Sequence, residues 1–422
     1  MGVLVSDESV VAVHASTVVG VSSEVITAAA NSPETARDGF GLYVHIPFCV
    51  SRCGYCDFNT YTASELGAGV SRETYASIVR AEIRAAAARF TQRSGVNDEH
   101  RDSPPRVDTV FFGGGTPTLL PAGDLAAILA EIDAAFGLAR GAEVTTEANP
   151  ESVDADYLAE LFDGGFTRLS VGMQSTSSHV LKILDREHSP AKALAAVEYA
   201  HKAGFEHVSL DLIYGTPGET EADFAASLAA AIDSGVDHVS AYALIVEDGT
   251  QLARRIRAGT VPQPSDDVAA DRYLAAEAAL SAAGFSWYEV SNWARSDEAR
   301  CRHNLLYWEG GHWWGAGPGA HSHLPGVRWW NHKHPSTYAT ALAQDIPLAG
   351  YETLTEDDRY LEQVMLRTRL SGGLPVTLLR TNGEAAAQRA ADDGLAVIEA
   401  GRLQLTLRGR LLADAVVRDL TA

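Results

Sequence analysis

Between residues 41 and 244, short runs rich in β-branched and aromatic residues alternate with longer, alanine-rich amphipathic stretches. Strands that alternate with helices predict a parallel sheet with right-handed crossovers. Six such units predict an α/β fold, a partial TIM-type (β/α)6 barrel. We expect strands at Leu42–Ile46, Thr109–Phe112, Glu143–Thr146, Arg168–Gly172, His207–Ile213 and His238–Leu244. We expect helices at Arg72–Phe90, Ala122–Phe136, Ala155–Asp163, Pro190–Ala203 and Glu221–Ser234.

Polar and glycine-rich motifs follow the first five of these strands. In barrels of this type the chemistry lies beyond the C-terminal ends of the strands, so motifs at those positions are expected to share one site. In strand order they are the cysteines of residues 49–56, Gly113–Thr116, Glu147, Gln174 and Tyr214–Gly218. A glycine triplet alone is more often a turn, but glycines also let a ligand approach main-chain N–H groups closely.

Cys49, Cys53 and Cys56 form a C-x3-C-x2-C motif directly after the first expected strand. A four-iron cluster is usually held by four thiolates. Three thiolates leave one iron with an open coordination position, which is typical of a reactive metal site. The amino and carboxylate groups of S-adenosylmethionine (SAM) can chelate such an iron, and an electron from the cluster can then cleave the sulfonium.

Two other interpretations of the three cysteines remain open. Their i, i+4, i+7 spacing fits one buried helix face, although Pro47 and Gly54 favour a loop. A zinc site is the second alternative, and it requires a fourth ligand, which His45 or Asp57 could supply. The position of the motif after a strand favours the iron–sulfur cluster over both.

Four further polar residues lie at or near the expected strand ends. Glu147 could receive an ammonium group or a ribose hydroxyl, and Arg186 could pair with a carboxylate through its planar guanidinium. Asp211 lies within an apolar strand, where an unpaired charge would be costly. Each of them, like Gln174, is as consistent with a structural role as with a functional one, but together they suit a zwitterionic nucleoside such as SAM.

Composition limits the partners and the compartment. The chain has 33 Lys+Arg against 55 Asp+Glu, a formal net charge of -22, which disfavours binding to nucleic acid. Its four cysteines are too few for a disulfide scaffold, and three of them lie close together, as in a metal site of a reducing compartment. We therefore expect a cytoplasmic protein without a transmembrane segment.

Residues 1–38 are expected to form a variable, disordered extension. Residues 2–36 contain no Lys or Arg, so the stretch does not read as a secretory signal. The first six residues, Met1 to Ser6, fit the N-myristoylation pattern formally, which leaves peripheral membrane association open, but a chance match is favoured.

The alternation of expected strands and helices ends after Gly284. We expect the barrel to occupy residues 39–284, a His- and Trp-rich connecting region to occupy 285–350, and a C-terminal winged-helix-like domain to occupy 351–422. This last domain is expected to contain a helix at Glu356–Leu370, a helix at Gly383–Asp393, a hairpin at Leu395–Leu407 and a final helix. Winged helices often serve only packing, so its order of elements does not by itself indicate DNA binding.

The motifs resemble the radical SAM superfamily and, within it, the oxygen-independent coproporphyrinogen III oxidase group. The resemblance spans roughly residues 41 to 420. It is carried by the sequences at 43–49, 111–118, 147–150, 170–175 and 211–218. It implies that Cys49, Cys53 and Cys56 bind a [4Fe–4S] cluster. It implies SAM contacts at Tyr43, Gly114, Gly115, Thr116, Glu147, Gln174, Arg186 and Asp211.

Two branches of this group differ in function. The oxidase, an enzyme of heme biosynthesis, carries a further cysteine two places past the third ligand, where this chain has Phe58. The heme chaperone branch, HemW, carries His-Asn-x-x-Tyr-Trp, which stands here as His303 to Trp308. The preceding Cys301 and the following segment 315–321 also resemble that branch.

The resemblance therefore implies a heme chaperone that binds heme and a SAM-liganded cluster and transfers heme to an acceptor protein. His303 is the candidate heme ligand, and Cys301 could be an axial thiolate. From the residues alone, the alternative is that the His303 ring packs in the barrel mouth and is hydrogen-bonded. The alternative functions are coproporphyrinogen III dehydrogenase and, disfavoured by the acidic charge, a zinc-stabilised winged-helix regulator.

Overall fold

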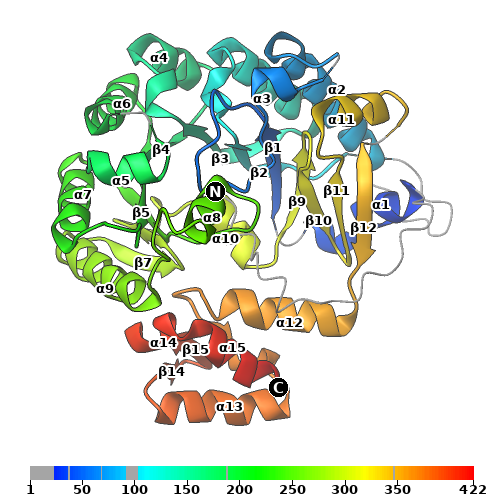
Figure 1. The fold of residues 1–422 in the computed structure, drawn as a ribbon. Helices are drawn as coiled ribbons and strands as arrows, with labels where there is room; N and C mark the ends of the chain where they lie inside the picture. The colour runs from blue at the N-terminus through cyan, green and yellow to red at the C-terminus, as the bar shows by residue number, and fades with distance from the viewer. Residues whose placement is uncertain (1–22, 37–38, 68, 92–102, 187–188, 346) are drawn as a thin grey trace.

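The computed structural model describes residues 23–36, 39–67, 69–91, 103–186, 189–345 and 347–422. At its centre six parallel strands follow one another in chain order (Figure 1). They are β1 (Phe40–Ile46), β2 (Val107–Gly114), β3 (Leu138–Ala148), β4 (Arg168–Gln174), β5 (His207–Tyr214) and β6 (His238–Ala243). Every predicted strand is present, and the predicted α/β fold is confirmed.

The helices that connect these strands cover the outside of the sheet (Figure 1). Two of them begin at clear side-chain caps: the Ser71 hydroxyl accepts from the Thr74 N–H, and the Asp154 carboxylate accepts from the Tyr157 N–H. No helix in the described ranges is long and apolar enough to cross a bilayer. The outer helices are α2 (Arg72–Arg89), α3 (Ala122–Phe136), α4 (Ala155–Asp163), α5 (Ser178–Ile183), α6 (Pro190–Ala203), α7 (Glu221–Asp233) and α9 (Asp266–Ala282). The short helix α8 (Gln251–Arg257) lies instead against Gly54, whose carbonyl accepts from the Leu252 N–H.

The sheet extends beyond the six expected strands at both edges. At one edge β9 pairs in parallel with β1 and continues into an antiparallel meander, and at the other β8 pairs antiparallel with β6. The segment 285–350 is therefore part of the sheet, because Trp314 and Trp329 bury one face of its strands. The added strands are β7 (Ser286–Glu289), β8 (Asn292–Ala294), β9 (His312–Ala316), β10 (His321–Leu324), β11 (Val327–Asn331) and β12 (Leu348–Thr353).

Part of the N-terminal extension, which we expected to be disordered, forms a helix. Residues Ser23–Ala30 form α1, which packs against α2, β10 and β11. Ile26 and Ala30 are fully buried there, because this short helix has an apolar face that fits the outer side of the meander. Residues 1–22, with the formal myristoylation pattern, lie outside the described residues.

The C-terminal region has the predicted order of helix, helix, hairpin and helix. Its buried apolar residues form a core of their own, which includes Val364, Ala387 and Leu403. A short strand, β13 (Leu374–Pro375), pairs with the hairpin. The other elements are α12 (Glu356–Arg367), α13 (Thr381–Asp392), β14 (Ala396–Glu399), β15 (Arg402–Leu405), α14 (Leu407–Leu411) and α15 (Ala413–Thr421).

Arg410 of α14 joins the C-terminal region to the barrel. Its Nη1 donates to the Glu277 carboxylate at 2.9 Å and to the Tyr273 hydroxyl at 3.2 Å, both on α9. Its guanidinium also lies 4.4 Å from the centre of the Trp287 ring on β7. A buried guanidinium with these partners stabilises the junction more than an exposed ion pair would.

The substitution Arg410→Ala should loosen this junction. We expect a loss of about 2 kcal/mol in unfolding free energy, because a buried charged hydrogen-bonding group is removed, together with faster proteolytic release of the C-terminal region. Arg408→Ala is the matched control, since the exposed Arg408 bonds only the Asp393 carbonyl. Denaturant unfolding and limited proteolysis measure both effects, and equal behaviour of the two variants would contradict this role for Arg410.

Candidate functional site

The three motif cysteines lie in one loop, residues 47–61, which we call the cysteine loop. Its two ends are tied together, because the Cys49 N–H donates to the Tyr61 carbonyl at 3.0 Å and the Tyr61 N–H donates to the Pro47 carbonyl at 2.7 Å. All three thiols are free and half-buried. The alternative of one buried helix face is wrong, since these residues form turns and bends rather than a helix.

The three thiols lie close enough to influence one another's ionisation. Burial, and after it charge repulsion from Cys53 and Cys49, raise the pKa of Cys56 to about 12. Arg186 supplies a compensating positive charge, since its Nη1 lies 3.3 Å from the Cys53 sulfur. Iron binds thiolates, so a bound cluster would overcome this resistance to ionisation.

The zinc alternative finds no support in the geometry of the described residues. Both ring nitrogens of His45 are engaged, by the Tyr43 hydroxyl at 2.9 Å and by the Asn59 carbonyl at 2.9 Å. Across the described part of the chain, no three His, Cys, Asp or Glu side chains, the motif cysteines included, are grouped as a metal site, so this finding does not distinguish zinc from an iron–sulfur cluster.

The glycine loop, residues 113–116, lies directly against the cysteine loop. The N–H groups of Gly115 and Thr116 donate to the carbonyls of Ile46 and Phe48 at 2.8 and 2.7 Å. A Cβ on Gly115 would stand 2.5 Å from the Phe48 carbonyl oxygen, so only glycine permits this approach. In this structure these two N–H groups therefore join the two loops instead of pointing to a ligand.

Two carboxylates lie inside the barrel, Glu147 near the end of β3 and Asp211 within β5. Glu147 accepts from the Gly114 N–H at 3.1 Å. Asp211 accepts from the Ser170 hydroxyl at 3.0 and 2.9 Å. Burial first, and the charge of Glu147 second, raise the pKa of Asp211 to about 6. An acidic pair of this kind suits an ammonium or hydroxyl group of a ligand.

Gln174 and Arg186 meet over Gly172. A Cβ on Gly172 would stand 2.9 Å from both Nε2 of Gln174 and Nη2 of Arg186, so the glycine leaves room for both. Gln174 adopts a left-handed backbone conformation with φ of 64°. The Nε of Arg186 is buried and has no hydrogen-bond partner among the described residues. An unsatisfied buried donor at this position fits a carboxylate ligand.

Tyr43 brings the first strand to the same place. Burial raises its pKa, with the charge of Glu147 as the next cause, so Tyr43 and Asp211 both lie near Glu147. The structure thus assembles the cysteine loop, the glycine loop and these polar side chains at the C-terminal ends of β1 to β5. Sequence reasoning missed Tyr55, whose pKa is raised mainly by burial and is influenced by both Arg186 and Cys53.

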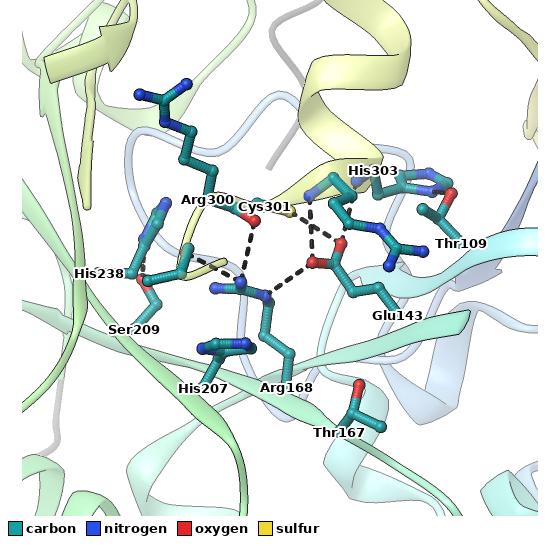
Figure 2. Close-up of polar contacts among 12 residues, drawn as sticks. Thr109, Glu143, Thr167, Arg168, His207, Ser209, His238, Arg300, Cys301 and His303 are labelled. Atoms are coloured by element: carbon teal, nitrogen blue, oxygen red, sulfur yellow. Dashed lines mark hydrogen bonds and ion pairs between the residues drawn. The ribbon is translucent and has the colours of Figure 1, made fainter. Parts of the chain in front are cut away.

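A second polar cluster closes the opposite, N-terminal end of the barrel (Figure 2). Glu143 on β3 accepts from Arg168 Nε at 3.1 Å and from the backbone N–H groups of Arg302 and His303 at 3.1 and 3.0 Å. Although burial acts in the opposite direction, the charge of Arg168 and these hydrogen bonds lower the pKa of Glu143. The start of α10 (Arg302–Trp308) is thereby held inside the barrel, and we call this cluster the barrel floor.

His303 and Cys301 are parts of this floor. The His303 ring is 1% exposed, and its two nitrogens lie 2.8 Å from the Thr109 and Tyr307 hydroxyls. The Cys301 sulfur donates to Glu143 at 3.6 Å, and burial raises the pKa of this thiol. The structure therefore shows His303 hydrogen-bonded, as in the structural alternative, but in the floor of the barrel and not in its mouth. Ligation of heme iron by this ring would require breaking one of its two bonds.

Comparison with known proteins identifies the family. The sequence profile of the radical SAM superfamily matches residues 43–231, and that of the HemN C-terminal domain matches residues 354–412. The heme chaperone HemW of Mycobacterium tuberculosis is 53% identical over 382 residues, 90% of this chain and 94% of that protein. The chain belongs to the HemW family of radical SAM proteins.

More distant members of the HemW family also match. HemW proteins of Synechocystis and Bacillus subtilis are 34% and 30% identical, each covering 79% of this chain and 78% and 84% of their own lengths. The structure of coproporphyrinogen III oxidase (HemN) from Escherichia coli covers 95% of this chain and 94% of its own, with a TM-score of 0.79 and 23% identity. At that identity it supports the fold alone.

The His-Asn-x-x-Tyr-Trp sequence, by which the chain resembles the HemW branch, is built into the barrel floor. The His303 ring and the Tyr307 hydroxyl are hydrogen-bonded to each other, and the two rings pack edge to face with their centres 4.7 Å apart. Asn304 and Trp308 both hydrogen-bond the buried Glu289. All four side chains that define the motif therefore have structural partners.

The His303 ring should make stability depend on pH. Burial lowers its pKa from 6.5 to about 3, so between these values the unfolded chain binds the proton and the folded one does not. Stability contributed by His303 is present above pH 6.5 and is lost as pH falls. Relative to His303→Gln, the wild type should lose on the order of 2 kcal/mol of unfolding free energy between pH 6.5 and 4.5.

Denaturant titration at several pH values measures this difference. His201→Gln is the control, because His201 is exposed at the end of α6. If the unfolding free energies of the wild type and of His303→Gln change with pH in the same way, the ring at this position is not buried and neutral.

Proposed function

We propose that this HemW-family protein is a heme chaperone, which binds heme and passes it to an acceptor protein. The observation that carries the proposal is the 53% identity, over 90% of the chain, to a protein named heme chaperone HemW. Relatives from Synechocystis and Bacillus subtilis carry the same name. Phe58, which is 39% exposed on the cysteine loop, agrees with the chaperone branch, because the oxidase has a cysteine at that place.

The proposed cofactors are a [4Fe–4S] cluster on Cys49, Cys53 and Cys56, and SAM at its open iron. The residues present fit these cofactors. They are three neighbouring thiols, the guanidinium of Arg186 beside Cys53, and the carboxylate pair of Glu147 and Asp211. When bound, the cluster supplies one electron to the SAM sulfonium. SAM would be held by Tyr43, Gly114, Gly115, Thr116, Glu147, Gln174, Arg186 and Asp211.

The protein's own residues would orient SAM. Arg186 would offer one buried donor to the carboxylate, and the carboxylates of Glu147 and Asp211 would be available to the ammonium and ribose groups. In the proposed role SAM regulates or enables heme transfer rather than oxidising a porphyrinogen.

We propose the cytoplasm as the place of action, since three thiolates ready for iron require a reducing compartment. The acceptor is proposed to be a protein and not a nucleic acid, because the chain carries a formal net charge of -22.

The chaperone proposal predicts binding without turnover. Anaerobically reconstituted protein should bind heme stably in a Soret titration and should not convert coproporphyrinogen III, whose products chromatography would detect. Phe58→Cys alone should not introduce that activity. Product formation by the wild type at catalytic rates would establish the dehydrogenase instead.

The cluster proposal predicts which cysteines matter for iron. Cys56→Ser should bind far less iron after reconstitution and lose the broad charge-transfer absorption of the cluster, because one of three iron ligands is gone. Cys301→Ser is the matched control, since Cys301 lies in the barrel floor, and it should keep both. Loss of iron from the Cys301 variant with retention in the Cys56 variant would reverse the assignment.

A further inference from the structure

One row of residues crosses the meander half of the sheet beside the SAM-binding residues. Tyr43 on β1 lies opposite Gly315 on β9, and His321 on β10 lies opposite Trp330 on β11, which lies opposite Gly350 on β12. The pairing of Trp313 with His323 places Gly315 next to His321, so the five residues form a continuous row. Residues directly opposite one another share a face of a sheet, so all five lie on the face that carries Tyr43.

The two glycines keep this row flat. A Cβ on Gly315 would stand 2.2 Å from the carbonyl oxygen of His321. A Cβ on Gly350 would stand 2.5 Å from the indole of Trp330, so that ring lies across the neighbouring strand. Gly315 therefore places no side chain between Tyr43 and His321, while the indole of Trp330 covers Gly350.

His321 differs from the histidines inside the barrel. In the described part of the chain, no hydrogen bond engages either of its ring nitrogens, whereas both nitrogens of His45, His238 and His303 and the Nδ1 of His323 are engaged. Its ring is half-buried and stacks on Trp330, with centres 5.8 Å apart and planes at 27°. A positioned imidazole with free nitrogens is the commonest metal ligand in proteins.

The residues around His321 keep its ring neutral and place a positive charge nearby. Burial, and after it the charges of Arg328 and Lys333, lower its pKa to about 4. At neutral pH one ring nitrogen therefore carries a lone pair for a metal. Lys333 is exposed and Trp313 is half-buried nearby, its indole N–H bonded to the His321 carbonyl at 2.9 Å. A porphyrin needs these two features, an aromatic wall and a cation near its propionates.

The loop before His321 is tied to the cysteine loop. The Asn59 amide donates to the Pro318 and Lys333 carbonyls at 3.0 and 2.9 Å. On the other side, the Gly317 N–H donates to the buried Glu82 carboxylate of α2 at 2.7 Å. His321 is therefore held in place by the same loop that carries the cluster cysteines.

We propose that His321 is the axial protein ligand to heme iron, with the porphyrin on the face of the sheet that carries Tyr43, His321 and Trp330. This inference rests on the proposed function, because it assumes that the protein carries heme. It assigns the ligand to a ring with free nitrogens beside the SAM residues and not to His303 or Cys301 of the barrel floor.

Heme titration of full-length protein tests the assignment. The probe is ferric heme, followed by its Soret absorbance and by magnetic circular dichroism, which reports the axial ligand. His321→Ala should weaken binding about tenfold or more and remove the histidine signature, and added imidazole should restore that signature. His323→Ala is the matched control, since His323 lies two residues along the same face with its Nδ1 on the Gly311 carbonyl, and it should bind as the wild type does.

The outcomes separate the two proposals. A wild type that binds no heme refutes the chaperone function itself. A wild type that binds heme while His321→Ala keeps the same affinity and ligand signature refutes the His321 assignment alone. Should His321→Ala fail to fold, His321→Met replaces it: a changed ligand signature supports the assignment, and a spectrum identical to the wild type overturns it.

Discussion

The buried ion pair between Glu143 and Arg168 determines how the two halves of the sheet are joined. Glu143 has all its acceptor capacity used by Arg168 and the start of α10, as a buried carboxylate requires. From α10 a short turn leads directly into β9, which adds to β1. The position of the whole meander, and of the His321 row within it, therefore depends on this pair.

The interior that results has two chemically different sides. Beneath the cysteine loop it is acidic and polar, with Glu147 and Asp211 near one another. Across β9 to β11 it is aromatic, with Trp313 and Trp330 half-buried. The first side matches a zwitterion and the second matches a flat apolar ring, and only the backbone of Gly315 lies between Tyr43 and His321.

Much of the barrel could be predicted from the sequence, because local signals determine it. Apolar runs and caps such as Ser71 and Asp154 define strands and helices through nearby residues. The placement of the cysteine motif followed from the same logic, since it comes directly after a strand.

The partners of the site residues could not be predicted in this way. The bond from His303 to Thr109 joins residues 194 positions apart, and no local pattern reports it. The meander was missed because β10 and β11 are short and rich in His and Trp, which usually suggests a ligand site rather than strands. A charge within an apolar strand was the one available signal for Glu143 and Arg168.

The hydrogen bonds between the cysteine loop and its neighbours have a consequence for how the protein matures. The glycine loop holds one side of the cysteine loop, and on the other side the Gly54 carbonyl accepts from the Leu252 N–H at 2.7 Å. These contacts are made by the chain itself, so the shape of the cysteine loop does not depend on a metal alone, unlike that of small domains that fold only around one. A bound cluster could then be lost and inserted again while these contacts hold the loop in place.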